Sequence, residues 1–302
     1  MILLSGTSNI PLAQAIAKEH SVPLGNVEIT RFIDNECRVR VIEEVEGESV
    51  IVIQSLSQIA DQHLMELCLI GQALKSLKAR RVVACIPWMG YSKQDKQFRR
   101  GESVSAELVA RFLEGAGFDD VVSIELHSEN LLPYFRVPIH ELSSHDVLLD
   151  AFRQRFPDAS GAVVVSPDRG GQSRSQRFAE EAGLRLVYLE KNRDRHTGKI
   201  DVVGISGSVD GKNLVIFDDI INTGSTAIKT SQFLKSHGCG RMYFLATHPV
   251  FAGDAIEKLS KCPIDHIIVT DTIAIPKEKY ISKLTVVSVS SLLSRALKEI
   301  VG

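Results

Sequence analysis

Two adjacent carboxylates directly follow an apolar run in the segment VIFDDIINTGSTA, residues 215–227. Asp218 and Asp219 precede a short run of small residues, 223–226, in which hydroxyl side chains flank Gly224. A glycine lets the backbone come close to a ligand, and backbone amides at the start of a helix can surround a phosphate. Carboxylates at the carboxyl end of a strand can accept hydrogen bonds from sugar hydroxyls or hold a hydrated magnesium ion. The segment therefore predicts a sugar-phosphate-binding loop.

A plainer interpretation of this segment is that Thr223 and Ser225 cap a helix and that the two acids are ordinary residues of a surface loop. Capping accounts for one serine or threonine, but it gives no reason for two adjacent acids after an apolar strand. The chain has neither a GxxxxGKS/T loop nor a GxGxxG after a predicted strand, so the usual nucleotide-binding loops are absent from the sequence. We favour the ligand-binding interpretation.

The elements around this loop are indicated by short apolar runs rich in β-branched residues. The runs are mostly unbroken, which is typical of strands buried on both faces, and they lie at 50–53, 81–86, 121–126, 162–166, 214–217, 242–247 and 266–271. Amphipathic, helix-like segments alternate with them at 59–78, 103–116, 172–183, 225–237 and 289–300. The alternation predicts an α/β fold whose sheets are mostly parallel.

One segment, 27–44, has a different pattern. Its polar and apolar residues alternate, so that Arg38 and Arg40 point to one face while Val39 and Val41 point to the other. This alternation predicts an antiparallel hairpin or flap with one face in solvent.

The length and composition favour two domains in a cytoplasmic protein. A chain of 302 residues with 44% hydrophobic residues can form more than one core, and the polar region at 143–146 is the expected boundary. The five cysteines are scattered, which favours reduced thiols over disulfides or a zinc site. We expect no signal peptide and no membrane span, because no apolar run is long enough. The net charge of −2 gives no general attraction to nucleic acid or to anionic membranes.

Six further segments extend the pattern beyond the loop. They are FIDNE (32–36), HLMEL (63–67), GYSKQDK (90–96), SIELHSE (123–129), SPDRGG (166–171) and THPVFAG (247–253). The loop resembles the phosphoribosyl-binding motif of the type I phosphoribosyltransferase fold. Together with the loop, the segments resemble, in order and spacing, the ribose-phosphate pyrophosphokinases, which are also called phosphoribosyl pyrophosphate (PRPP) synthetases.

The resemblance implies two phosphoribosyltransferase-like domains, each a mostly parallel sheet flanked by helices. We expect residues 1–144 to form the ATP side with the flap, and residues 145–302 to carry the ribose 5-phosphate loop. The implied reaction moves the β,γ-diphosphoryl group of Mg-ATP to the anomeric hydroxyl of ribose 5-phosphate, which gives PRPP and AMP for nucleotide biosynthesis. Such a transfer requires positioning and positive charge more than covalent catalysis.

The resemblance also implies roles for individual residues. Those for ATP binding are Phe32, Asp34, Glu36, Lys93, Gln94, Asp95 and His127. Those for ribose 5-phosphate binding are Asp218, Asp219, Asn222, Thr223, Gly224, Ser225 and Thr226. Lys191 and Arg193 are implied as catalytic residues in a basic, mobile loop, and His127 and Asp168 as contacts of Mg²⁺. The flap residues are expected to reach the ATP site of a neighbouring subunit, so the resemblance implies a homo-oligomer.

Several alternatives and departures stay open at this point. A basic run is usually a solvated loop, and an isolated histidine is usually structural. Asn222, Glu125 and Arg169 differ from the residues common in the family, and Glu46 and Gly101 stand where an arginine is usual, so the allosteric phosphate and ADP site is not expected to be intact. The other functions considered are a PRPP-using phosphoribosyltransferase and a non-catalytic protein that regulates a true synthetase.

Overall fold

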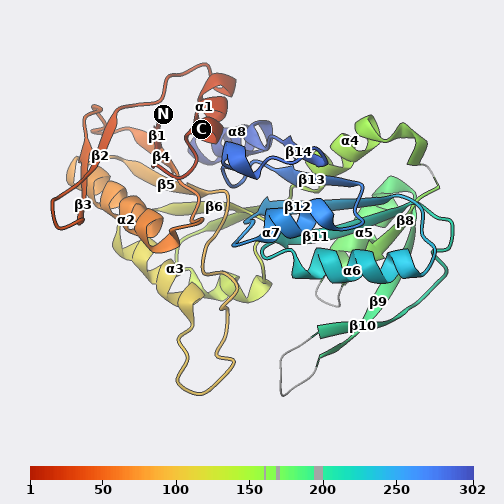
Figure 1. The fold of residues 1–302 in the computed structure, drawn as a ribbon. Helices are drawn as coiled ribbons and strands as arrows, with labels where there is room; N and C mark the ends of the chain where they lie inside the picture. Colours follow the sequence, from red (N-terminus) through yellow and green to blue (C-terminus); the bar gives the residue numbers. More distant parts are fainter. Residues whose placement is uncertain (160, 168–170, 194–199) are drawn as a thin grey trace. The chain divides into compact units, whose positions relative to one another are not determined.

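The computed structural model describes residues 1–159, 161–167, 171–193 and 200–302, with side chains at 191–193 and 200–201 excepted. The chain divides into two compact units (Figure 1). The first consists of Met1–Ser143, Thr272–Ala274 and Ser288–Gly302, and the second of Ser144–Asp271 and Ile275–Val287. No helix of the described part is long and apolar enough to cross a membrane.

The first unit is built on a five-stranded sheet in the order β1-β4-β5-β6-β7, in which all neighbours are parallel. Its strands are β1 (Ile2–Ser5), β4 (Ser49–Ile53), β5 (Arg81–Ile86), β6 (Asp120–Ile124) and β7 (Ile139–Leu142). Its helices are α1 (Ile10–Glu19), α2 (Ala60–Ser76), α3 (Ser105–Gly115), η1 (Glu129–Tyr134) and α8 (Ser290–Val301). Every residue of β4 is buried, as its unbroken apolar run predicts. The helices α2 and α3 pack on one face of this sheet through Leu67, Leu74 and Val109.

The predicted flap is confirmed as a separate antiparallel hairpin of β2 (Val27–Arg31) and β3 (Cys37–Val41). Ile29 and Val39 pack against the core of the first unit, whereas Arg38 and Arg40 are exposed. The alternation of polar and apolar residues in the sequence thus gives the hairpin one buried face and one face in solvent.

The second unit is built on a seven-stranded sheet in the order β10-β9-β8-β11-β12-β13-β14. Its strands are β8 (Val163–Ser166), β9 (Arg185–Arg193), β10 (Ile200–Ile205), β11 (Leu214–Ile221), β12 (Met242–Pro249), β13 (His266–Thr270) and β14 (Leu284–Val287). All pairs are parallel except β9 with β10. The α/β class with mostly parallel sheets is confirmed in both units.

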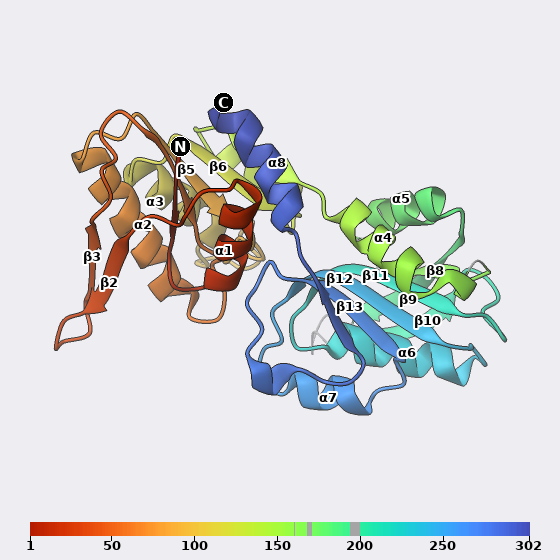
Figure 2. The same cartoon turned by 90° about the horizontal axis from the view of Figure 1, so that it is seen from above.

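Helices cover both faces of the second sheet (Figure 2). They are α4 (His145–Arg155), η2 (Pro157–Ala159), α5 (Gln172–Ala182), α6 (Ser225–Ser236), α7 (Ala255–Lys261) and η3 (Lys277–Lys279). Phe152 and Phe178 bring α4 and α5 onto the face that carries Phe217. Leu234 and Leu259 bring α6 and α7 onto the opposite face. The strand β11 therefore lies between two helical layers.

The two units are not separated by a single boundary after residue 144. The N-terminal stretch of the first unit does end at Ser143, but residues Ser288–Gly302 return to that unit. The reason is packing: α8 lies against α1, and Ser291 donates a hydrogen bond from Oγ to Glu19 Oε1 at 2.7 Å.

Candidate active site

The two acids of the predicted loop lie within strand β11, which continues to Ile221 rather than ending at residue 217. Asp218 is 8% exposed and Asp219 is 5% exposed. The Asp219 amide donates to Asp218 Oδ1 at 3.0 Å. Since β11 has β8 on one side and β12 on the other, both carboxylates lie near the carboxyl end of a central strand, where open α/β sheets bind ligands.

Arg174, in the first turn of α5, is a member of this site that the sequence analysis missed. Its Nη1 lies 3.4 Å from Asp219 Oδ1, and its side chain is 20% exposed. A buried carboxylate is costly unless a cation or hydrogen-bond donors compensate it. The available signal was an arginine just after the segment 166–171, on the helix that follows a strand adjacent to β11.

The turn after β11 has the form expected of an anion-binding loop. Gly224 has φ +72° and precedes the first residue of α6, a conformation that favours glycine over other residues. Thr223 Oγ1 and Ser225 Oγ lie 3.0 Å apart and both residues are exposed. Within the described part of the chain no side chain caps α6, so the interpretation of Thr223 and Ser225 as simple helix caps is not supported.

The segment 247–253 supports this turn from the side. The Phe251 amide donates to the Ile221 carbonyl at 3.0 Å, and the Ala252 amide donates to the Asn222 carbonyl at 2.9 Å. Asn222 is half-buried and Thr226 is half-buried. The structure thus brings the seven residues expected for ribose 5-phosphate together in one strand, turn and helix start.

The flap residues expected at ATP form a compact turn in the first unit. The Phe32 amide donates to the Glu36 carbonyl and the Asn35 amide to the Phe32 carbonyl, both at 2.9 Å, while the Glu36 amide donates to Asp34 Oδ1 at 3.2 Å. The Phe32 ring is 51% exposed, and the Arg38 guanidinium lies 5.8 Å from its centroid. An exposed aromatic ring beside two acids is available for a planar ligand.

The segment 93–95 is joined to the segment that follows His127. Asn130 Nδ2 donates to Asp95 Oδ2 at 2.9 Å, and the Tyr134 hydroxyl donates to the Asp95 carbonyl at 2.6 Å. Burial opposes ionisation of the Asp95 carboxyl, but hydrogen bonds from Asn130 and Ser128 outweigh it and lower the pKa of Asp95. This buried carboxylate therefore holds two segments together, a structural task that the sequence analysis did not foresee.

The remaining nucleotide-side residues have different surroundings. Gln94 accepts a hydrogen bond from Ser105 Oγ at 2.7 Å. Lys93 Nζ lies 5.8 Å from the centroid of the Trp88 ring. His127 is exposed shortly after the end of β6.

Three of the expected residues are not placed with their side chains. Asp168 lies outside the described residues. Lys191 and Arg193 lie within the last residues of β9, whose backbone pairs with β10, rather than in a loop after that strand, and their side chains lie outside the described part.

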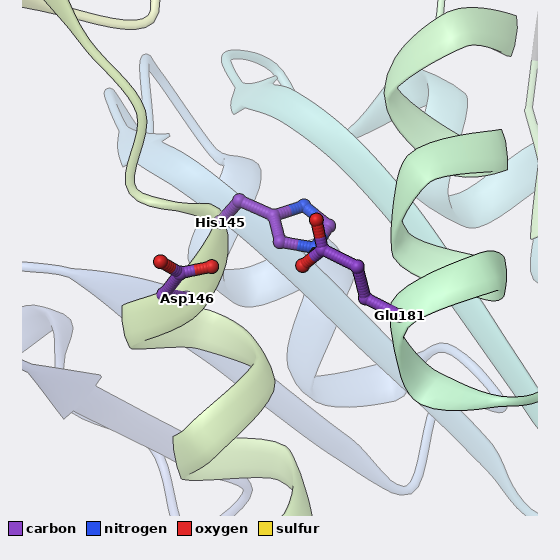
Figure 3. Close-up of side chains that lie close together, drawn as sticks. All are labelled: His145, Asp146 and Glu181. Atoms are coloured by element: carbon purple, nitrogen blue, oxygen red, sulfur yellow. Dashed lines mark ion pairs between the residues drawn. The ribbon is translucent and has the colours of Figure 1, made fainter.

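A second group of ligand-type side chains joins α4 to α5 in the second unit (Figure 3). His145, Asp146 and Glu181 each bring a possible metal-ligand atom within 4.8 Å of the others. His145 is 2% exposed, and its Nε2 lies 2.8 Å from Glu181 Oε2. Arg177 also pairs with Glu181, with Nε 2.9 Å from Oε1, and this hydrogen bond lowers the pKa of Glu181 most. Because the nitrogens of Arg177 and His145 already lie close to this carboxylate, the group is described as a contact between two helices.

An apolar groove of about 540 Å³ lies between α2 and α3 in the first unit. Its lining includes Leu64, Met65, Cys68, Leu108 and Phe112. Met65, Leu108 and Phe112 are about half exposed, and burial raises the pKa of the Cys68 thiol to about 11. None of the residues expected for substrate binding lines this groove.

Comparisons with known proteins cover nearly the whole chain. The N-terminal domain of ribose phosphate pyrophosphokinase matches residues 1–117, and the phosphoribosyl synthetase-associated domain matches residues 185–302. The chain is 36% identical to ribose-phosphate pyrophosphokinase 1 of Listeria monocytogenes over 98% of this chain and 92% of that protein. It is 35% identical to ribose-phosphate pyrophosphokinase of Ralstonia nicotianae over 100% of this chain and 95% of that one. The structure is similar to the crystal structure of phosphoribosylpyrophosphate synthetase from Mycobacterium smegmatis, with a TM-score of 0.92, 32% identity, and coverage of 99% and 98% of the two chains.

Proposed function

The chain belongs to the ribose-phosphate pyrophosphokinase family, and on this premise we propose that it transfers the β,γ-diphosphoryl group of ATP to the anomeric hydroxyl of ribose 5-phosphate. The products are PRPP and AMP. The observation that carries the proposal is a pair of buried carboxylates, Asp218 and Asp219, directly before a helix that opens at Gly224.

The phosphate and the sugar of ribose 5-phosphate suit different parts of this loop. The phosphate is bound by the amides and hydroxyls at 223–226, because a helix N-terminus carries partial positive charge and unpaired N–H donors. The vicinal hydroxyls of the ribose are donors, and Asp218 and Asp219 accept from them. Arg174 pairs with Asp219 and orients its carboxylate.

The nucleotide is bound by residues of the first unit. Phe32 stacks on the adenine, and Asp34 and Glu36 accept hydrogen bonds from the polar edge of the base. Lys93 and His127 contact the nucleotide phosphates, while the paired Asp95 holds their two segments in register. The exposure of Phe32 supports this assignment, since an aromatic ring in solvent gains from being covered.

We propose Mg²⁺ as the metal of the reaction. Mg²⁺ prefers oxygen ligands, a class that includes the carboxylates of Asp218 and Asp219, whereas the imidazole of His127 suits an indirect contact through water. Bound with ATP, the ion neutralises charge on the phosphoryl oxygens. Asp168, the other proposed contact, is a carboxylate as well.

Lys191 and Arg193 supply positive charge to the transferring group. An ammonium neutralises developing charge as a compact point, and a guanidinium grips two phosphate oxygens at once. Both residues lie at the end of β9, and the family resemblance assigns them to a basic segment that closes over the substrates.

The experiment that tests this function measures AMP formation from ATP and ribose 5-phosphate with Mg²⁺. We expect AMP and PRPP in equal amounts, and no AMP when ribose 5-phosphate is left out. Failure to form AMP with both substrates present would reject the synthetase activity. A non-catalytic regulator of the family would give that negative result, and a PRPP-using phosphoribosyltransferase would consume PRPP without needing ATP.

A further inference from the structure

Arg31, the last residue of β2, connects the turn of the flap to helix α2. Its Nη1 donates to the Asn35 carbonyl at 3.2 Å, inside the turn 32–36. Its Nη2 donates to Gln62 Oε1 at 3.2 Å and lies 3.3 Å from Glu66 Oε1, both in α2. One guanidinium thus ties the tip of a hairpin to a helix of the core, which its planar fork of donors allows.

Glu66, the acceptor at the core end of this tether, is itself fixed. Its side chain is 5% exposed, and its Oε2 accepts from Thr7 Oγ1 at 2.6 Å and from Gln54 Nε2 at 3.0 Å. Gln54 is fully buried and accepts from the Ser8 amide at 3.0 Å. A Cβ at Gly6 would come within 2.4 Å of the Gln54 side chain, so this glycine is needed for the close approach. The carboxylate is therefore held by the loop after β1 and by the end of β4.

Burying a carboxylate in the packing of a helix is energetically unfavourable. Its desolvation can outweigh the attraction of its partner, and an apolar residue of similar size often stabilises a fold more. The charged pair instead fixes the orientation of the side chains. Each oxygen of Glu66 has a defined hydrogen-bond donor, and the donor to Oε1 is Arg31, the residue that also contacts the Asn35 carbonyl.

We propose that Glu66 and Arg31 are positioning residues for the nucleotide, because they fix the flap turn that carries Phe32, Asp34 and Glu36. This inference rests on the proposed function, in which that turn binds the adenine of ATP. Neither Glu66 nor Arg31 needs to touch the substrate. Their effect is to hold the turn in its binding shape before ATP arrives, which lowers the ordering cost of binding.

The kinetic part of the test uses Arg31→Met, which keeps the length of the side chain and removes its charge. We expect the KM for ATP to rise roughly tenfold, as for loss of one charge-assisted contact, while kcat and the KM for ribose 5-phosphate stay within about twofold. Arg31→Lys should recover part of the effect, because an ammonium can pair with Glu66 but lacks the fork that also reaches Asn35. Glu66→Gln should change the KM for ATP in the same direction as Arg31→Met.

The matched control is Arg40→Met on the same hairpin. Arg40 pairs with Glu28 at 3.6 Å, and both side chains are more than half exposed. Exposed pairs of this kind contribute little, so we expect no change in any kinetic constant. Circular dichroism should show the same fold for all variants.

The structural part of the test is hydrogen exchange of the flap amides, measured by mass spectrometry on the full chain without substrate. Exchange across 32–36 should be faster in Arg31→Met than in the natural protein or in Arg40→Met. Unchanged exchange would overturn the inference, whatever the kinetics. Faster exchange with an unchanged KM for ATP would reject the positioning role together with the placement of ATP at the flap, while AMP formation would still support the reaction itself.

Discussion

Asp218 and Asp219 place two carboxyl groups side by side in the interior of the second unit, and each has a local partner. Asp219 is paired with Arg174 at 3.4 Å, and Asp218 accepts the Asp219 amide at 3.0 Å. Without such partners a buried carboxylate would be neutral or would destabilise the fold. The fold thus gives each of the two carboxylates a partner at the place that we propose for the sugar phosphate.

Asp218→Asn tests this role at the residue scale, because it keeps the shape of the side chain and removes its charge. We expect the KM for ribose 5-phosphate to rise by about tenfold to a hundredfold, since a hydrogen bond to a charged group contributes 1.5–3 kcal/mol. The KM for ATP should stay within about twofold, because the residues that we propose for the adenine and the nucleotide phosphates do not include Asp218. Steady-state kinetics with each substrate varied in turn gives both values. Asp254→Asn is the control, an exposed acid of the same unit that pairs with Lys258 at 2.7 Å; equal effects of the two variants would remove Asp218 from the site.

Lys191→Ala tests the proposed source of positive charge. We expect kcat to fall by roughly a hundredfold or more with little change in either KM, because the lysine acts on charge that develops in the transition state. The measurement is the rate of AMP formation at saturating substrates. Lys212→Ala, an exposed lysine of the same unit, should leave the rate unchanged. A Lys191→Ala enzyme of normal activity would contradict the catalytic assignment.

At the scale of elements, three strands of the first unit are tied together at their starts. Arg81 begins β5, Asp120 begins β6, and His140 lies in β7. Arg81 Nε lies 2.8 Å and His140 Nε2 lies 3.1 Å from the Asp120 carboxylate, which is 3% exposed. Burial opposes ionisation of this carboxyl, but the two hydrogen bonds and charges outweigh it, and the pKa of Asp120 is lowered.

This cluster predicts a specific response to acid. A carboxyl whose pKa is lowered by folding contributes stability that is present above its unfolded pKa of about 3.9 and is lost as the pH falls through the folded value. Asp120→Asn should therefore lower the free energy of unfolding at pH 7 by on the order of 2 kcal/mol, a reduced figure because Arg81 is partly exposed. Below pH about 4 the difference between variant and natural protein should shrink. Urea denaturation at several pH values measures this, with the exposed Glu44→Gln as control; a difference independent of pH would contradict the charge-based account.

The elements that the sequence predicted well were those with a long, unbroken apolar run. The strands β4, β5, β12 and β13 are of this kind, and the alternating flap was equally clear. The strands β1, β7 and β14 were missed, since none of these four-residue strands contains three consecutive valines, which made the equally short β8 recognisable. Strand β11 was predicted too short, because Asp218 and Asp219 read as the end of an apolar run although the ladder continues through them.

The residues of the candidate site, like the strands, were predicted only in part. The loop at 215–227 could be found because its residues are adjacent in the sequence. Arg174 and the structural task of Asp95 could not, because each depends on a partner that only the fold brings near. The roles of the expected substrate-binding and catalytic residues remain predictions.

At the scale of the whole molecule, we expect copies of this chain to assemble through the groove between α2 and α3. Met65, Leu108 and Phe112 expose apolar surface there, and the apolar flap tip at Phe32 and Ile33 is exposed as well. Clustered apolar surface of this kind marks contact sites more often than scattered residues do. A partner copy would cover it.

Phe112→Glu tests this assembly. A charge in the groove should lower the mass of the particle measured by light scattering after gel filtration, because an unpaired charge in an apolar interface costs several kcal/mol. Folding should be retained, since Phe112 is 45% exposed. Tyr280→Glu, an exposed aromatic residue of the second unit, is the control. An unchanged mass for Phe112→Glu would exclude the groove as the subunit contact.

The place of α8 has a consequence for how the protein is made. The helix lies beside α1 in the first unit, where Leu293 and Leu297 are buried, and Arg81 donates to the Ile300 carbonyl near its end (Figure 2). Chains emerge from the ribosome in sequence order, so the second unit is complete before the residues of α8 appear. Until then the first unit has an apolar face uncovered. The part of the chain synthesised first is thus the part that finishes folding last.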